Sequence, residues 1–367
     1  MKKIIIVILL AFLISVPPVI ANFEPTEQSL SLPLKFSWRD INGTDFTTPA
    51  KNQAPAPLCE AYALCGALEA LIQYKVGYNF GCDLSEAHLF FYANGTALWG
   101  VNVQEAANYL LEHGVPDEGC FPDARRCFDT PFESLDGWEN RTVKITEWGW
   151  VDNRIENIKQ ALVEHGPLVI CMLTRNDFFR YKRGIYIPHG PVKGGHVITI
   201  FGYDDEQRYW EVKNSGGTDW GEDGWIRVSY DAHTPDHPFF WPFYGGTGIL
   251  YIDGVYGNFQ PDVPQITIDE PEFYHTYLRG RKLPTFFSNL RFIQKGVPRI
   301  IGSMMVQVSV VNTDSVEFFV DGESKFIDDQ RPFEWEFHDE KGLHTIEVFA
   351  YNEHNVSKAI SDVHVLR

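Results

Sequence analysis

Four residues of this chain could together cleave an acyl bond. Cys59 follows Pro57-Leu58 at the expected start of a helix, where free backbone N–H groups and the helix dipole favour an anion. A thiol placed there loses its proton more easily, and the thiolate is the nucleophile. His196 could take that proton and return it to the leaving group, and the amide of Asn214 could orient its ring. The backbone N–H of Cys59 and the side-chain amide of Gln53 could then donate to the oxyanion.

These residues stand in sequence blocks that follow one another in a fixed order. The blocks are Phe36-Ser-Trp-Arg-Asp40, Thr48-Pro-Ala-Lys-Asn-Gln53, Leu84-Ser-Glu86, Gly194-Gly-His196 and the run from Lys213 to Trp225. His196 lies 137 residues after Cys59, and Asn214 lies 155 residues after it. Together the blocks resemble the papain family of cysteine peptidases, over roughly residues 33 to 252.

The resemblance implies a function and a set of roles. It makes the chain a cysteine peptidase that hydrolyses peptide bonds through a thioester acyl-enzyme, with protein or peptide substrates and no cofactor or metal. Cys59 is then the nucleophile, His196 the base and acid, Asn214 the ring orienter and Gln53 an oxyanion donor. The substrate-binding candidates are Gly100, Gly195 and Trp220, although a plain turn explains Gly100 equally well.

Several positions depart from the family pattern. Glu60 replaces the tryptophan that usually follows the nucleophile, and a carboxylate there would raise the thiol pKa unless it points away along the helix. Gly216 replaces the tryptophan that shields the histidine–asparagine bond, so we expect that bond to be wetter and weaker. Two alternatives therefore stay open: a catalytically degenerate binding protein with the papain fold, and a cell-wall amidase or transpeptidase.

The elements that must position these residues can be placed from periodicity. Apolar spacing and breakers predict helices from about Leu58, over 84–92, over 103–112 and over 155–164, with the first burying one face. Four short β-branched or aromatic runs predict strands at 168–173, 196–202, 209–213 and 224–229, with His196 at a strand entrance. Helices followed by strands indicate an α+β domain. The resemblance implies a helical lobe and a β-barrel-like lobe within residues 36–253.

The last hundred residues have a different composition. Residues 254–265 read as a linker because of their Pro and Gly content, and residues 266–367 are expected to be all strand. Val316, Phe318 and Val320 alternate with polar neighbours before the hairpin signal Asp321-Gly322. This region resembles the immunoglobulin-like β-sandwiches appended to exported bacterial and archaeal enzymes. We expect it to contact a cell surface or polysaccharide.

Composition and the N-terminus bear on the compartment. The chain has 367 residues and a formal charge of −18, which argues against nucleic-acid partners. Residues 1–21 have the basic start, apolar run and small residues of a signal peptide, followed by an arm over 22–35. We therefore expect a secreted or cell-surface monomer, with an N-terminal membrane anchor as the alternative. Among six cysteines, Cys120 with Cys127 is the best candidate disulfide, and Cys65 with Cys82 is a weaker one.

Overall fold

A computed structural model describes most of the chain. The described residues are 32–54, 56–96, 100–122, 134–232, 240, 246–258, 261–284 and 296–366. The predicted signal peptide (1–21), most of the predicted arm and Cys127 lie outside these ranges. Residues 33–367 form one compact unit. Within the described ranges, no helix is both long enough and apolar enough to cross a membrane.

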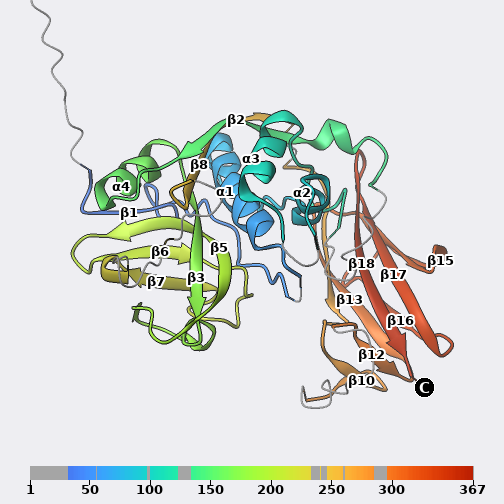
Figure 1. Cartoon of the computed structure of the whole chain (residues 1–367). Helices are drawn as coiled ribbons and strands as arrows, with labels where there is room; N and C mark the ends of the chain where they lie inside the picture. Colours follow the sequence, from blue (N-terminus) through green and yellow to red (C-terminus); the bar gives the residue numbers. More distant parts are fainter. Residues whose placement is uncertain are drawn as a thin grey trace, which may run out of the picture. The chain divides into compact units, whose positions relative to one another are not determined.

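Each of the four predicted helices is present. They are α1 (Cys59–Val76), α2 (Glu86–Tyr92), α3 (Val103–Glu112) and α4 (Ile155–Glu164). Ser85 caps α2, where its side chain accepts the backbone N–H of His88, and Asn102 caps α3 in the same way. The prediction that α1 buries one face is wrong, since every residue from Glu60 to Gln73 is buried. Helix α1 contacts α2 and α3 as well as strands of the sheet, so it has no solvent face over that length (Figure 1).

One mixed sheet runs beside α1. Its strands are β1 (Lys35–Ser37), β2 (Val143–Trp150), β3 (Leu168–Arg175), β4 (Ile185–Tyr186), β5 (Val192–Asp204), β6 (Tyr209–Lys213), β7 (Trp225–Ser229) and β8 (Ile249–Gly257). Their order is β2-β8-β3-β5-β6-β7-β4, with β1 paired to β5. The four predicted strands are confirmed as β3, β5, β6 and β7. Strand β8 continues through Gly257 opposite Val143, so it overlaps the start of the predicted linker.

The sheet separates two apolar cores. One core packs α1, α2 and α3 against β2, β8 and inward-facing residues of β3 and β5, and Leu64 and Leu68 are fully buried in it. The other packs α4 against β3, β5, β6 and β7 around Ile198 and Trp210. Burial of such side chains is worth about 1.5–3 kcal/mol each and is the main force that holds the helices to the sheet. The α+β class is thereby confirmed.

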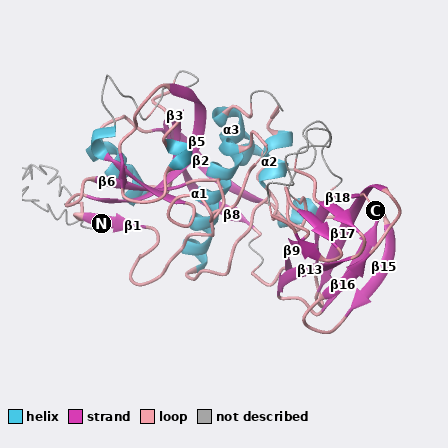
Figure 2. Ribbon diagram, turned by 90° about the horizontal axis from the view of Figure 1, so that it is seen from below, coloured by secondary structure: helices cyan, strands magenta, loops and turns pink. Residues whose placement is uncertain are grey.

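The C-terminal region is all β (Figure 2). Its strands are β9 (Gln265–Glu270), β10 (Thr276–Leu278), β11 (Arg281–Lys282), β12 (Arg299–Ile301), β13 (Met304–Val311), β14 (Ser315–Val320), β15 (Glu323–Asp328), β16 (Glu334–Phe337), β17 (Gly342–Tyr351) and β18 (Val356–Val365). They form one sheet in the order β11-β10-β12-β18-β17-β14-β15 and another in the order β16-β13-β9. The predicted alternation in β14 holds, since Val316, Phe318 and Val320 are buried. The hairpin turn also forms, with positive φ at Asp321 and Gly322.

Candidate active site

Cys59 is the first residue of α1. Its thiol is partly exposed and donates to the Oε2 atom of Glu60 over 3.3 Å. Burial, followed by the Glu60 carboxylate, raises the pKa of the thiol well above its usual value, while the backbone N–H of Val197 opposes the rise. Of the two alternatives for Glu60, the one in which it points away along the helix is therefore wrong, and the one in which its carboxylate raises the thiol pKa is confirmed.

His196 lies inside β5, opposite Met172 of β3, and not at the strand entrance that was predicted. Its Nε2 atom is 2.8 Å from the Oδ1 atom of Asn214, which directly follows β6. Since an amide oxygen only accepts, Nε2 carries the hydrogen and Nδ1 remains for a proton from the thiol. Burial lowers the pKa of His196, and the Asn214 hydrogen bond opposes that change. Within the described residues, no hydrogen bond joins His196 to Cys59.

Packing around the histidine corrects a second expectation. Asn214 is only 6% exposed, so its bond to His196 is shielded despite Gly216. The ring of Phe178 stands edge-on to His196 with 5.8 Å between centroids, and it lies 5.0 Å from Trp220. Phe178 belongs to a short 3-10 helix after β3 and carries no motif, so the sequence offered no sign of this role. The aromatic ring that packs on His196 thus comes from a segment outside the predicted site.

The loop before α1 is tied to the loop that carries Asn214. The backbone N–H of Gln53 donates to the carbonyl of Ser215 over 3.0 Å, and Asn52 forms a bridge with Gly216. The side chain of Gln53 accepts from the Ser215 hydroxyl, and its Nε2 donates to the carbonyl of Ala56 over 2.8 Å. Gln53 is thus held near the start of α1, and one of its two amide hydrogens remains for a ligand.

The three predicted substrate-binding residues lie in different settings. Gly100 has φ +71°, and a Cβ there would stand 2.9 Å from Glu60 Oε2, so the position requires glycine. Gly195 precedes His196 in β5 and pairs with Leu173. Trp220 packs on Phe178 and Tyr181. Their contacts with substrate remain predictions.

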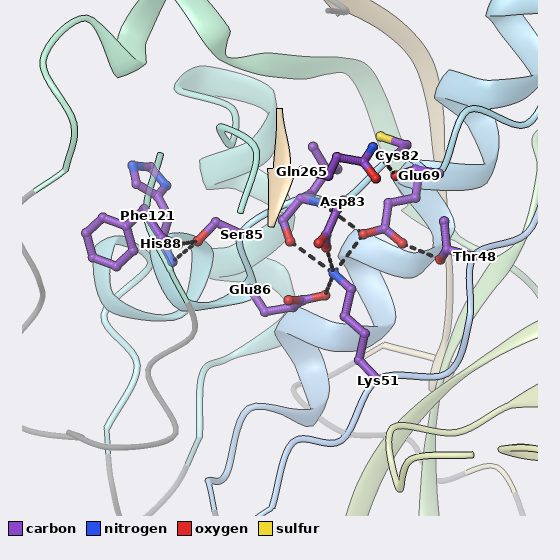
Figure 3. A network of polar contacts seen from close by, with 12 residues as sticks. Thr48, Lys51, Glu69, Cys82, Asp83, Ser85, Glu86, His88, Phe121 and Gln265 are labelled. Atoms are coloured by element: carbon purple, nitrogen blue, oxygen red, sulfur yellow. Dashed lines mark hydrogen bonds and ion pairs between the residues drawn. The ribbon is translucent and has the colours of Figure 1, made fainter. Parts of the chain in front are cut away.

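A buried charge network supports the same loops (Figure 3). The ammonium of Lys51 lies 3.0 Å from Glu69 on α1, 2.7 Å from Glu86 on α2 and 2.5 Å from Asp83. Burial opposes its charge, yet the three carboxylates raise the pKa of Lys51 well above its usual value. Lys213, next to Asn214, reaches the network through Thr48. Burial lowers the pKa of Lys213 to about 8.

The predicted disulfides are wrong for the cysteines that the structure describes. Cys59, Cys65, Cys82, Cys120 and Cys171 are all free. The buried thiol of Cys120 donates to Asp117 over 3.6 Å instead of forming a bridge. The backbone N–H of Cys82 donates to the side-chain oxygen of Gln73 over 3.1 Å, and the thiols of Cys65 and Cys82 are both buried without a bridge.

One described group could hold a metal ion, although the sequence predicted none. The ligand atoms of Glu147, His165 and Asp253 lie within 4.8 Å of one another. His165 already bonds Asp253 over 2.8 Å and stacks on Tyr251 at 4.0 Å. These contacts account for the grouping without an ion. Glu147 and Asp253 belong to the β2–β8 pair and His165 follows α4, so the grouping is on neither α1 nor β5.

A thiol at a helix start and a histidine–asparagine pair on an adjoining sheet define the cysteine hydrolase class of site. Comparison with known proteins specifies the family: residues 32–236 match the papain family of cysteine proteases, and the chain belongs to that family. Mouse cathepsin M is 29% identical over 223 residues, which cover 55% of this chain and 62% of cathepsin M. Zingipain-2 of Zingiber officinale is 27% identical over 226 residues, which cover 56% of this chain and 91% of zingipain-2.

A solved structure is similar as well. Bromelain from Ananas comosus, determined with the inhibitor E64, superposes with a TM-score of 0.50 at 26% identity. The match covers 60% of this chain and 99% of bromelain. The papain-like fold is therefore established for the first part of the chain, and the C-terminal strands lie beyond the family match.

Proposed function

We propose that this protein is an exported endopeptidase-like thiol hydrolase. Cys59 attacks the scissile carbonyl, His196 shuttles the proton and Asn214 holds the imidazole. Two species follow in turn: a tetrahedral intermediate, whose oxyanion accepts from the Cys59 backbone N–H and from Gln53, and a thioester that water hydrolyses. The observation that carries the proposal is the 2.8 Å bond between His196 Nε2 and Asn214 Oδ1, which leaves Nδ1 for the thiol proton.

The family assignment and the local supports favour this chemistry over a binding protein or a cell-wall amidase. The hydroxyl of Thr199 donates to the carbonyl of Ala63, which ties β5 to α1 just beyond the reacting residues. The shielded His196–Asn214 pair is what a working base requires, since a buried hydrogen bond fixes ring and tautomer.

The test is hydrolysis of denatured casein and of fluorogenic peptides by the full chain. Cys59→Ala should abolish cleavage, because it removes the sulfur that the mechanism requires for the acyl-enzyme. Cys82→Ala is the matched control, because it removes a buried thiol in the loop between α1 and α2, and it should retain the rate. Equal peptidase activity in Cys59→Ala and wild type would defeat the proposal, and cleavage of peptidoglycan alone would favour the amidase.

Export and attachment are part of the same proposal. The signal-like residues 1–21 support cleavage before Asn22 and secretion. A monomer is the oligomeric state that belongs to this proposal. The C-terminal strands would form an immunoglobulin-like domain that holds the enzyme to a cell surface or polysaccharide. N-terminal sequencing of secreted protein should begin at Asn22, and an intact Met1 in secreted, active material would contradict this part.

A further inference from the structure

Glu60 occupies a position where it can control the nucleophile. Its carboxyl is 8% exposed and lies between the Cys59 sulfur, 3.3 Å away, and the backbone at Gly100. In this arrangement the thiol hydrogen is directed to Glu60, and no hydrogen bond joins the thiol to His196 in the described chain. The sulfur is therefore held in a state from which the thiol cannot pass its proton to the imidazole.

We propose that Glu60 is a positioning residue that keeps the Cys59 thiol from His196 while its carboxylate is ionised, and releases the thiol when it is protonated. The inference rests on the proposed function. After release, the S–H bond of Cys59 breaks and an N–H bond forms at His196 Nδ1. The products are a thiolate and an imidazolium, and Glu60 keeps its own proton throughout. A neutral carboxyl can also donate to the thiolate, whereas a carboxylate would repel it.

The surroundings of Glu60 make such a titration accessible. Burial raises the pKa of Glu60 to about 7. Hydrogen bonds to the carboxyl from its own backbone N–H, the Cys59 thiol and the Val101 N–H oppose this rise. The titratable groups that face Glu60 are the thiols of Cys59 on α1 and Cys171 on β3. His196 of β5 directly precedes Val197, whose backbone N–H lies at the Cys59 sulfur. The 100–101 segment offers backbone groups only, and no ion pair of Glu60 occurs in the described part of the chain. No cation therefore holds the carboxylate ionised.

The test compares iodoacetamide alkylation of Cys59 from about pH 5 to 8.5, with the site read by peptide mass analysis. Glu60→Gln is neutral at every pH, so it should react at least about tenfold faster than wild type near pH 8, one pKa unit being tenfold. Near pH 5.5, where wild-type Glu60 is protonated, the two rates should agree within about threefold. Glu112→Gln, at an exposed end of α3, is the matched control and should follow wild type throughout.

The possible outcomes distinguish the role of Glu60 from the proposed function. Equal rates for Glu60→Gln and wild type across the range, with peptidase activity intact, would overturn the role of Glu60 alone. An unreactive Cys59 and no hydrolysis in wild type would instead overturn the proposed function. Should Glu60→Gln fail to fold, Glu60→Asp applies the same test, because its shorter carboxylate withdraws from the sulfur and should also raise the rate near pH 8. An unchanged profile in that variant would overturn the proposal equally.

Discussion

His88 on α2 should make the peptidase domain sensitive to acid. Its ring is fully buried, and among the described residues neither ring nitrogen has a hydrogen-bond partner. Tyr92, Trp138, Phe121 and Tyr109 surround it, with ring centroids 4.5, 4.7, 5.5 and 5.8 Å away. A charged imidazole would lose its hydration there without gaining a partner, and burial accordingly lowers the pKa of His88 from 6.5 to about 3.

The sign and size of the effect follow from linkage. Because the folded pKa is the lower one, the unfolded chain binds the proton first, so stability is complete above about pH 6.5 and falls towards pH 3. At pH 5 the imidazole of His88 is protonated in the unfolded chain, where its pKa is 6.5, but not in the folded one. Relative to pH 7.5, this difference lowers the free energy of unfolding by about 2 kcal/mol. For a domain of this size that corresponds to a fall in Tm of about 4–8 °C.

The assay is thermal unfolding of wild type and His88→Phe at pH 7.5 and pH 5. Phenylalanine cannot titrate, so the variant should gain about 2 kcal/mol relative to wild type as the pH falls, whatever its stability at neutral pH. His354→Phe, which removes an exposed imidazole, should show no such gain. Parallel falls in Tm for wild type and His88→Phe would refute the reasoning.

Two further substitutions test the supports of the site. Lys51→Met leaves the buried carboxylates of Glu69 and Glu86, and the partly exposed one of Asp83, without their cation, so it should lower the free energy of unfolding by about 3–5 kcal/mol in urea titrations. The exposed Lys325→Met should change it by less than about 0.5 kcal/mol. Phe178→Ala uncovers the bond between His196 and Asn214, so kcat should fall about tenfold or more while KM changes little, in steady-state assays on a fluorogenic peptide. A Lys51→Met effect below about 1 kcal/mol, or a Phe178→Ala effect on KM alone, would contradict these roles.

Local signals predicted much of the fold. Caps and periodicity placed α3 and α4 at their observed bounds, and β-branched runs placed β6 and β14. Strand β8 was not predicted, because the glycines near its end at residue 257 are typical of a linker. Its pairing with β2 is a contact between distant segments, which local sequence does not indicate. The burial of α1 on every side was also invisible, since it depends on which elements pack around the helix.

The candidate site divides in the same way. The order of Gln53, Cys59, His196 and Asn214 in the sequence was enough to identify the family, and it predicts the chemistry. What the sequence could not give is the orientation of side chains: Glu60 turned onto the sulfur, and Phe178 supplied the cover that Gly216 lacks. Both depend on tertiary packing, which residue types and spacing do not record. The disulfide predictions were wrong for the same reason, because the pairing of cysteines depends on distances in the folded chain.

The most direct test of the central claim is the alkylation rate of Cys59 at about pH 6, in wild type and in His196→Ala. If His196 takes the thiol proton, wild type should react well above the rate of free cysteine, and His196→Ala should lose at least about tenfold. Equal rates in the two proteins would contradict the account, because the sulfur would then be ionised without help from the imidazole.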